Sequence, residues 1–264
     1  MTRRPPGILQ RWLPPLLLLG VLVAAWEGAV ALTGVNPVTL PAPTRVIAAL
    51  WDFRAAALEH LAVTLTETLL GFGVAVLFAV GTAVVLDRIP FVRRAVEPLL
   101  VASQTIPVVA IAPLLVIWFG FGLAPKVVVV VLVTFFPITV ALLDGFARVP
   151  AEATDLMRSF GASEGATFRK LRWPAALPAL FTGLRISVVY AVIGAIFGEY
   201  VGARTGLGIW MQLSQNSFRT DLVFAAILLT ALASMALYAG VRLIERVAIP
   251  WAPGVRREAP SPVR

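Results

Sequence analysis

Residues 64–86 read TLTETLLGFGVAVLFAVGTAVVL, an almost uninterrupted apolar run. It contains one charged side chain, Glu67, and it is long enough to cross a bilayer, whose hydrocarbon takes roughly 20 mainly apolar residues. Five more stretches of this kind occur along the chain, approximately at residues 13–32, 98–119, 127–143, 175–201 and 222–244. The sequence therefore predicts an all-α membrane protein with six transmembrane helices.

The composition supports lipid as the surroundings of this chain. Hydrophobic residues make up 59% of its 264 residues and charged residues 14%, against roughly 45–50% and about 25% in soluble domains. The net charge of +8 does not indicate nucleic-acid binding, because the Arg residues lie between apolar runs rather than on one basic face. With no cysteine and a single histidine, we expect no disulfide, no metal site and no cofactor.

Lys and Arg are distributed unequally between the two sets of loops. Sixteen of them lie at the chain ends and in the second-to-third and fourth-to-fifth loops, and five lie in the opposite loops. Because cytoplasmic loops carry the excess of positive charge, both termini are predicted to be cytoplasmic. Arg185, just inside the fifth stretch, is expected to reach the cytoplasmic surface by snorkelling. A cleaved signal peptide ending at residues 29–31 is the alternative for the first stretch, but Glu27 lies just before that site.

A short amphipathic helix is predicted outside the membrane, between the first two spans. Three prolines within residues 37–43 break the chain, and Thr44 can cap a helix that continues to Leu61 with one apolar face. We expect this helix to lie in the membrane interface, with His60 as an ordinary polar residue at its end. No repeat or low-complexity tract occurs, so we expect one domain over residues 1–264 with a core at about 60–248.

The longest cytoplasmic loop, residues 150–173, mixes acidic and basic side chains with large apolar ones. It reads as short amphipathic helices interrupted at Gly161. A charged loop that only fixes the topology is the simpler alternative. The chain has no Gly-Lys followed by Ser or Thr, which a common phosphate-binding loop needs, so any ATP hydrolysis belongs to another chain.

The spacing within this loop is similar to that of permeases from binding-protein-dependent ABC importers. Their loop reads Glu-Ala-Ala, three residues, Gly, nine residues, then Ile-x-Leu-Pro. Here residues 155–157 are Asp-Leu-Met, residue 161 is Gly, and residues 171–174 are Leu-Arg-Trp-Pro at the same separations. The Gly and the Pro match this pattern, whereas Asp replaces Glu and Trp replaces Leu.

The resemblance implies the fold of a type I ABC importer permease, which works as a dimer with two cytoplasmic ATPase subunits and an external substrate-binding protein. The segment from Asp155 to residue 169 would be the coupling helix that rests in a groove of the ATPase. Leu156, Met157 and Phe160 would supply its apolar anchor, and Gly161 would permit the turn.

Nearly the whole chain resembles the nitrate, sulfonate and taurine type of permease. Similar segments in that group include Ile106-Pro107, Trp118-Phe119-Gly120-Phe121-Gly122, Phe135-Phe136-Pro137-Ile138, Gly183-Leu184-Arg185 and Gly206-Leu207-Gly208. Residues 103–115 and 197–203 look most like permeases for hydroxymethylpyrimidine-type thiamine precursors. The resemblance thus implies import of such a pyrimidine, with sulfonate, taurine, nitrate or riboflavin as the alternative substrates.

Four residues are candidates for the translocation path. Gln104 and Thr105 lie in a Pro-containing part of the third stretch, where irregular backbone is tolerated only against protein or water; a kink for packing alone is the alternative. Tyr190 and Glu199 lie on the fifth stretch, and a carboxylate there is a functional candidate by default. Glu199 could equally snorkel or pair with Arg204 near the external end.

The fifth stretch also has a glycine at every fourth position from residue 194 to residue 206. On a helix these glycines form one stripe, which we expect to serve close helix packing rather than to line a pore.

Two other classes of function fit the sequence less well. An intramembrane enzyme needs converging acid, base or metal groups, whereas Glu27, Glu67, Asp144 and Glu199 are scattered over different predicted helices without a histidine partner. A secondary transporter or channel would show inverted repeats or paired ionisable groups, and neither is visible. We therefore expect a transport subunit rather than an enzyme.

Overall fold

The computed structural model describes residues 8–252, with side chains from residue 13 onward, and every regular element in that part of the chain is helical. In chain order the elements are α1 (Ile8–Thr33), α2 (Pro43–Asp52), α3 (Arg54–Arg88), α4 (Pro90–Ser103), α5 (Val108–Phe119), α6 (Leu123–Ala147), α7 (Ala151–Ser159), α8 (Glu164–Thr167), the π-helical turn η1 (Phe168–Arg172), α9 (Trp173–Tyr200), α10 (Leu207–Asn216) and α11 (Thr220–Ala248). The prediction of an all-α protein is confirmed.

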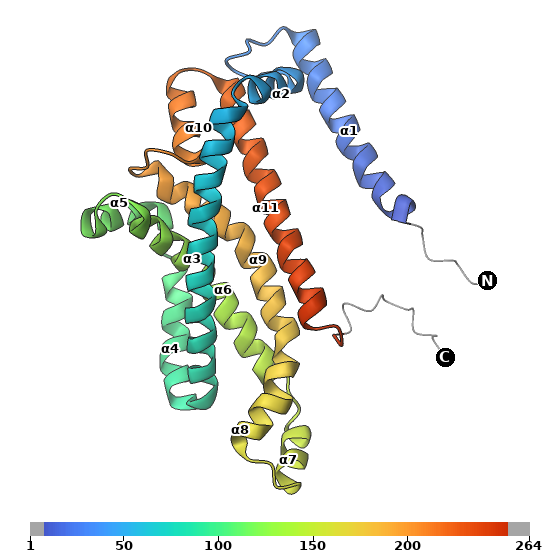
Figure 1. The fold of residues 1–264 in the computed structure, drawn as a ribbon, viewed down its shortest axis with the longest axis vertical. Coiled ribbons are helices and arrows are strands. Elements are labelled where there is room, and N and C mark those ends of the chain that lie inside the picture. The colour runs from blue at the N-terminus through green and yellow to red at the C-terminus, as the bar shows by residue number, and fades with distance from the viewer. Residues whose placement is uncertain (1–7, 253–264) are drawn as a thin grey trace, which may run out of the picture.

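The long helices α3, α6, α9 and α11 run along the molecule, with α2 and α10 at one end and α7 and α8 at the other (Figure 1). Side chains of α6 such as Ile138, Leu142 and Phe146 are almost completely buried. They pack against α3 and α9, which places α6 at the centre of the core. The short helices α2, α7, α8 and α10 lie at the two ends of this bundle (Figure 1), and a cavity lies in its middle.

Glycines let α9 approach α6 closely. A Cβ atom at Gly194 would lie 2.7 Å from a methyl carbon of Val133, and one at Gly198 would lie 3.1 Å from the Cα atom of Lys126. The expected packing role is confirmed for these two glycines. The next two members of the stripe, Gly202 and Gly206, lie beyond the end of α9 at Tyr200, so they do not form one helical stripe with the first two.

The membrane spans follow the prediction, with one correction. Five helices are long and apolar enough to cross a membrane, and a sixth span exists if α4 and α5 count as one. The predicted third span is not continuous, because α4 and α5 meet at an angle of 98°. Pro107 is the N-cap of α5, and a proline there removes a backbone donor and forces the preceding residue out of the helical conformation.

The predicted external helix is also corrected. It ends at Asp52, the chain turns at Phe53, and residues 54–61 already belong to α3. Thr44 does not cap this helix, because Pro43 occupies its first turn. The hydroxyl of Thr44 instead donates a hydrogen bond of 2.8 Å to Glu27 of α1. The sequence periodicity continued across the turn, so the pattern could not locate it.

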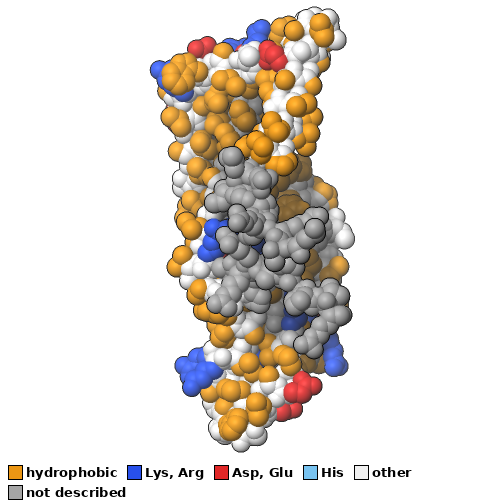
Figure 2. Space-filling view, turned by 90° about the vertical axis from the view of Figure 1, so that its right-hand side faces the viewer, with side chains coloured by type: hydrophobic (Ala, Val, Ile, Leu, Met, Phe, Trp, Pro, Cys, Tyr) orange, Lys and Arg blue, Asp and Glu red, His pale blue; other side chains and the backbone are white. Residues whose placement is uncertain are grey.

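Helix α1 stands apart from the bundle over most of its length (Figure 1). It meets the rest of the chain near its C-terminal end, where Glu27 binds Thr44 and the ring of Trp26 lies 5.5 Å from that of Phe224. Its leucines at residues 16–19 are exposed. Figure 2 shows hydrophobic side chains over much of the visible face and acidic side chains near its two ends, as expected of a body surrounded by lipid.

The two sets of loops defined by their positive charge lie at opposite ends of the molecule. Arg88, Arg158 and Arg172 lie at the end that carries α7 and α8, whereas Arg45 and Arg219 lie at the end that carries α2 and α10. Five arginines of the predicted cytoplasmic set, at positions 3, 4, 256, 257 and 264, lie outside the described residues, as does the side chain at position 11. Lys126 is one of the five basic residues that the sequence places in the opposite, external loops. It is instead a buried residue in the first turn of α6.

Candidate functional site: a cavity at the helix break

A cavity of about 430 Å³ opens beside the break between α4 and α5. Its walls come from the end of α4, the start of α5, the middle of α6 and one residue of α9. The lining residues are Ser103, Gln104, Ile106, Val108, Ile111, Leu132, Val133, Phe136, Pro137 and Tyr190. All of them are uncharged, and the cavity lies between the two charged ends of the molecule.

Two of the lining residues can offer polar groups to a bound molecule. Within residues 13–252, the side-chain amide of Gln104 and the hydroxyl of Tyr190 have no hydrogen-bond partner, and Tyr190 is half exposed. The hydroxyl of Ser103 is already used, because it donates to the carbonyl of Leu100 at 2.7 Å. An apolar cavity with an amide, a phenol and an aromatic ring suits a flat, neutral molecule with hydrogen-bonding edges.

The structure brings together two of the four residues predicted for the translocation path. Gln104 and Tyr190, far apart in the sequence, lie on the same cavity. Thr105 is next to Gln104, but its hydroxyl donates to the carbonyl of Ala102 at 2.7 Å, and it is not among the lining residues. Glu199 is completely buried near the opposite end of α9 from the coupling loop and does not line the cavity either.

The predicted coupling segment forms two short helices with a turn between them. Gly161 has a φ of +76°, and the amide of Ala162 donates to the carbonyl of Met157 at 3.0 Å to close the turn. Leu156 and Phe160 expose 57% and 81% of their surface, and Asp155 pairs with Arg158 at 3.7 Å. The predicted interruption at Gly161 is confirmed, and an apolar patch with charges around it faces outward.

This loop is tied to the ends of two core helices. Arg172 of η1 forms a 2.7 Å ion pair with Asp87 of α3, and the guanidinium of Arg88 lies 5.0 Å above the ring of Phe168. The Phe168 ring also lies 5.5 Å from that of Phe146 on α6. These contacts connect the loop directly to α3 and α6.

The most extensive buried polar cluster was not predicted from the sequence. Glu199 accepts hydrogen bonds from the hydroxyl of Thr64 at 2.5 Å and from the amide of Gly208 at 2.5 Å. Lys126 of α6 forms an ion pair with Glu67 of α3. Two of the four carboxylates expected to be scattered, Glu67 and Glu199, therefore lie near each other, close enough for their charges and that of Lys126 to interact.

One expectation about a single charge is wrong, and a second charge has a partner that the sequence does not indicate. Glu199 does not pair with Arg204 but with groups of α3 and α10, because α9 ends at Tyr200 and the chain folds back. Arg185 pairs with Glu245 of α11 at 3.0 Å. In both cases the partner lies on another helix, and only the tertiary structure identifies it.

The comparisons with known proteins agree with this architecture. The family described as "Binding-protein-dependent transport system inner membrane component" matches residues 71–248. A probable ABC transporter permease protein from Haemophilus influenzae is 41% identical over 86% of this chain and 93% of its own length. The formylaminopyrimidine transport permease protein ThiX from Halalkalibacterium halodurans is 37% identical over 90% of this chain and 96% of its own.

Two further similarities extend the comparison. The riboflavin transport system permease protein RibX from Chloroflexus aurantiacus is 36% identical over 95% of this chain and 97% of its own. In a solved structure of the MetNI methionine ABC transporter in an inward-facing conformation, one chain superposes with a TM-score of 0.59. The match covers 75% of this chain and 96% of that chain at 21% identity, so it shows the fold of a type I ABC importer permease.

Proposed function

The chain belongs to the family of inner-membrane components of binding-protein-dependent transport systems, and we propose that it imports a thiamine-precursor pyrimidine of the hydroxymethylpyrimidine type. It is a multi-pass membrane subunit of an ABC importer and not an enzyme, and hydrolysis of ATP takes place on a separate chain.

The uncharged lining of the cavity is the observation that favours a neutral substrate. A pyrimidine is flat and neutral, so it can stack on the ring of Tyr190 and exchange hydrogen bonds with the amide of Gln104. The cavity volume of about 430 Å³ lies toward the small end of the range for ligand sites, roughly 300–1,000 Å³. The relative ThiX is named for a formylaminopyrimidine, which is consistent with this choice.

A sulfonate, taurine or nitrate anion is the competing substrate class. It would favour an Arg side chain or a helix N-terminus at the cavity. The N-terminus of α5 does lie on the cavity wall at Val108, whereas Arg185 is already paired with Glu245. Riboflavin, named for the relative RibX, has a larger ring system than a pyrimidine and would fill more of the cavity.

The proposed assembly contains two copies of this permease, cytoplasmic ATPase subunits and an external substrate-binding protein. Leu156 and Phe160, which are exposed, contact the ATPase together with the partly buried Met157, while Asp155 sets the orientation of the coupling segment and Gly161 its turn. Both termini are cytoplasmic in this assignment, which puts α7 and α8 inside and α2 and α10 outside. The permease domain then spans residues 1–264, with its core at 60–248 and the coupling loop at 150–173.

Transport assays with the complete complex test the proposal. The permease is reconstituted in liposomes with its ATPase subunit and binding protein, and uptake of labelled hydroxymethylpyrimidine is compared with that of taurine and of riboflavin. We expect ATP-dependent uptake of the pyrimidine and little uptake of the other two. Equal uptake in the absence of the ATPase subunit would overturn the importer mechanism, and faster uptake of taurine would overturn the substrate.

A further inference from the structure

Three consecutive backbone amides at the start of α10 are each bound by a different side chain. The amide of Gly206 donates to Nδ1 of His60 at 2.9 Å, that of Leu207 to the hydroxyl oxygen of Thr64 at 2.8 Å, and that of Gly208 to Glu199 at 2.5 Å. The first amides of a helix have no partner within the helix. Here α3 supplies two of the partners and α9 supplies the third.

We call His60, Thr64, Glu199 and the amides of residues 206–208 the outer clamp. Its members support one another, because the hydroxyl of Thr64 accepts from Leu207 and donates to Glu199 at 2.5 Å. The carboxylate also lies at the positive end of the α10 dipole, where a negative charge is favoured. Thr64 and Glu199 are almost completely buried, so water does not compete for these hydrogen bonds.

The backbone of the outer clamp leaves room for glycine only. A Cβ atom at Gly206 would collide with the carboxylate of Glu199, and one at Gly208 would lie 2.6 Å from the carbonyl oxygen of Ile196. Gly206 also has a φ of +133°, which favours glycine. This close approach gives the Gly-Leu-Gly segment a physical role: it brings the start of α10 against Glu199.

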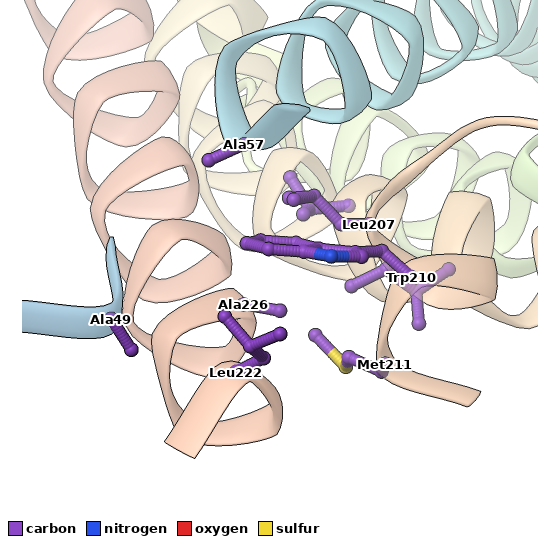
Figure 3. Close-up of a cluster of buried hydrophobic side chains, with 9 residues drawn as sticks. Ala49, Ala57, Leu207, Trp210, Met211, Leu222 and Ala226 are labelled. Carbon is purple, nitrogen blue, oxygen red and sulfur yellow. The ribbon is translucent and has the colours of Figure 1, made fainter. Parts of the chain in front are cut away.

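An apolar cluster already holds α10 in place without the clamp. Figure 3 shows the indole of Trp210 lying between Ala57 of α3 and the Leu222 and Ala226 side chains of α11. Leu207 and Met211 are buried in the same cluster. A buried carboxylate is costly unless its geometry is well satisfied, and an apolar replacement is often no less stable. Stability alone therefore does not explain why position 199 has a buried carboxylate. A role of Glu199 in fixing the position of α10 explains it.

The outer clamp is connected to the cavity through the helices that carry it. Glu199 and Tyr190 lie nine residues apart on α9, roughly 14 Å along the helix axis. One turn along α3 from Thr64, Glu67 forms an ion pair with Lys126 at the start of α6. Both α6 and α9 line the cavity and both border the coupling loop, so each joins all three features.

We propose that Glu199, with Thr64 and His60, is a positioning residue of the transport cycle, and this inference rests on the proposed function. The outer clamp makes α10 move together with α3 and α9 when the coupling loop moves. Because α9 lines the cavity and carries Glu199, the clamp joins α10 to a wall of the cavity. Without the clamp, α10 stays attached through Trp210 but no longer follows α9, so hydrolysis proceeds with little transport.

The test compares uptake per ATP hydrolysed in reconstituted complexes. Glu199→Gln removes the charge, and Thr64→Val removes the hydroxyl at nearly constant shape. We expect each to lower this ratio roughly tenfold, the effect of about 1.4 kcal/mol, while copurification of the ATPase subunit stays unchanged. Thr64→Ser keeps the hydroxyl and should restore the ratio. Glu97→Gln, which alters an exposed pair with Arg93 on α4, is the matched control.

A second measurement reports the position of α10 independently of transport. The chain has no cysteine, so Ser214→Cys places a single thiol on α10 at a site that is 5% exposed. We expect slow labelling by a maleimide in the otherwise unchanged chain and faster labelling when Glu199→Gln is added. The pattern of labelling distinguishes a failed clamp from a failed importer, because it needs no substrate.

The outcomes separate the possibilities. An unchanged ratio in Glu199→Gln and Thr64→Val overturns the inference, as does a loss of uptake and hydrolysis in equal proportion while the complex stays assembled. If Glu199→Gln does not fold, the comparison of Thr64→Val with Thr64→Ser decides the matter. If the unmodified complex shows no ATP-driven uptake, the proposed function fails, and the labelling of residue 214 still tests the clamp.

Discussion

Gly161 sets the shape of the coupling segment through its backbone alone. A Cβ atom there would meet nothing within 4 Å, but its φ of +76° is unfavourable for other residues, by about 1–2 kcal/mol. We expect Gly161→Ala to weaken stimulation of the ATPase by substrate, and Gly161→Asn to weaken it less because Asn tolerates this conformation. Gly165→Ala is the control, since residue 165 also has open space but no positive φ.

The measurement is substrate-stimulated hydrolysis in reconstituted complexes, with membrane insertion followed by the yield of permease. Equal stimulation in the Gly161 and Gly165 variants would show that the turn does not matter for coupling.

At the cavity, Gln104→Leu removes one hydrogen-bonding side chain at similar size. Loss of one hydrogen bond costs about 0.5–1.5 kcal/mol, so we expect the KM for uptake to rise by roughly two- to tenfold with ATPase activity intact. Ser103→Ala is the matched control, because the Ser103 hydroxyl lines the cavity but is bonded to Leu100. A larger effect of Ser103→Ala than of Gln104→Leu would contradict the proposed contact.

At the scale of elements, the ion pair between Arg172 and Asp87 joins the coupling loop to α3. The Asp87 side chain is 5% exposed, and one of its oxygens has no hydrogen-bond partner among the described residues. Removing one partner of a buried pair costs about 3–5 kcal/mol, an upper limit here because Arg172 is partly exposed. We therefore expect Arg172→Met to lower the thermal unfolding midpoint and the uptake rate.

The double variant Asp87→Asn with Arg172→Met leaves no unpaired charge, so it should recover part of both losses. Thermal unfolding of the purified complex and uptake in liposomes measure the recovery. A double variant that is as damaged as the sum of the single variants would show that the pair does not link the two elements.

The elements predictable from the sequence are those whose signal is local. Spans such as α3 and α6 are recognisable from the length of their apolar runs, and Gly161 indicates the interruption of the coupling segment. The break between α4 and α5 was seen as a polar, Pro-containing stretch, but its angle of 98° depends on packing. The sequence does not indicate the outer clamp, because three of its four hydrogen bonds join residues more than 100 positions apart, as from Thr64 to Glu199.

In the whole molecule, three features follow one another along α6 and α9, and the proposed transport function depends on their order. The coupling loop lies at one end, the cavity in the middle and the outer clamp at the other end. Packed helices move as stiff bodies because their interiors are dense. On the proposed function, a displacement of the loop would therefore reach the far end of α9 with little loss, and ATP-driven motion at one site would change access to the cavity.

The distribution of positive loops predicts which end of the molecule faces the cytoplasm. Ser159 of the coupling segment and Ser217 after α10 are both exposed, and one span, α9, separates them. Because the chain has no cysteine, Ser159→Cys and Ser217→Cys each introduce a single thiol. With positive loops inside, a membrane-impermeant maleimide added to intact cells should label residue 217 and leave residue 159 unlabelled until the membrane is opened. The reverse pattern would turn the molecule over and place the coupling segment where no ATPase can reach it.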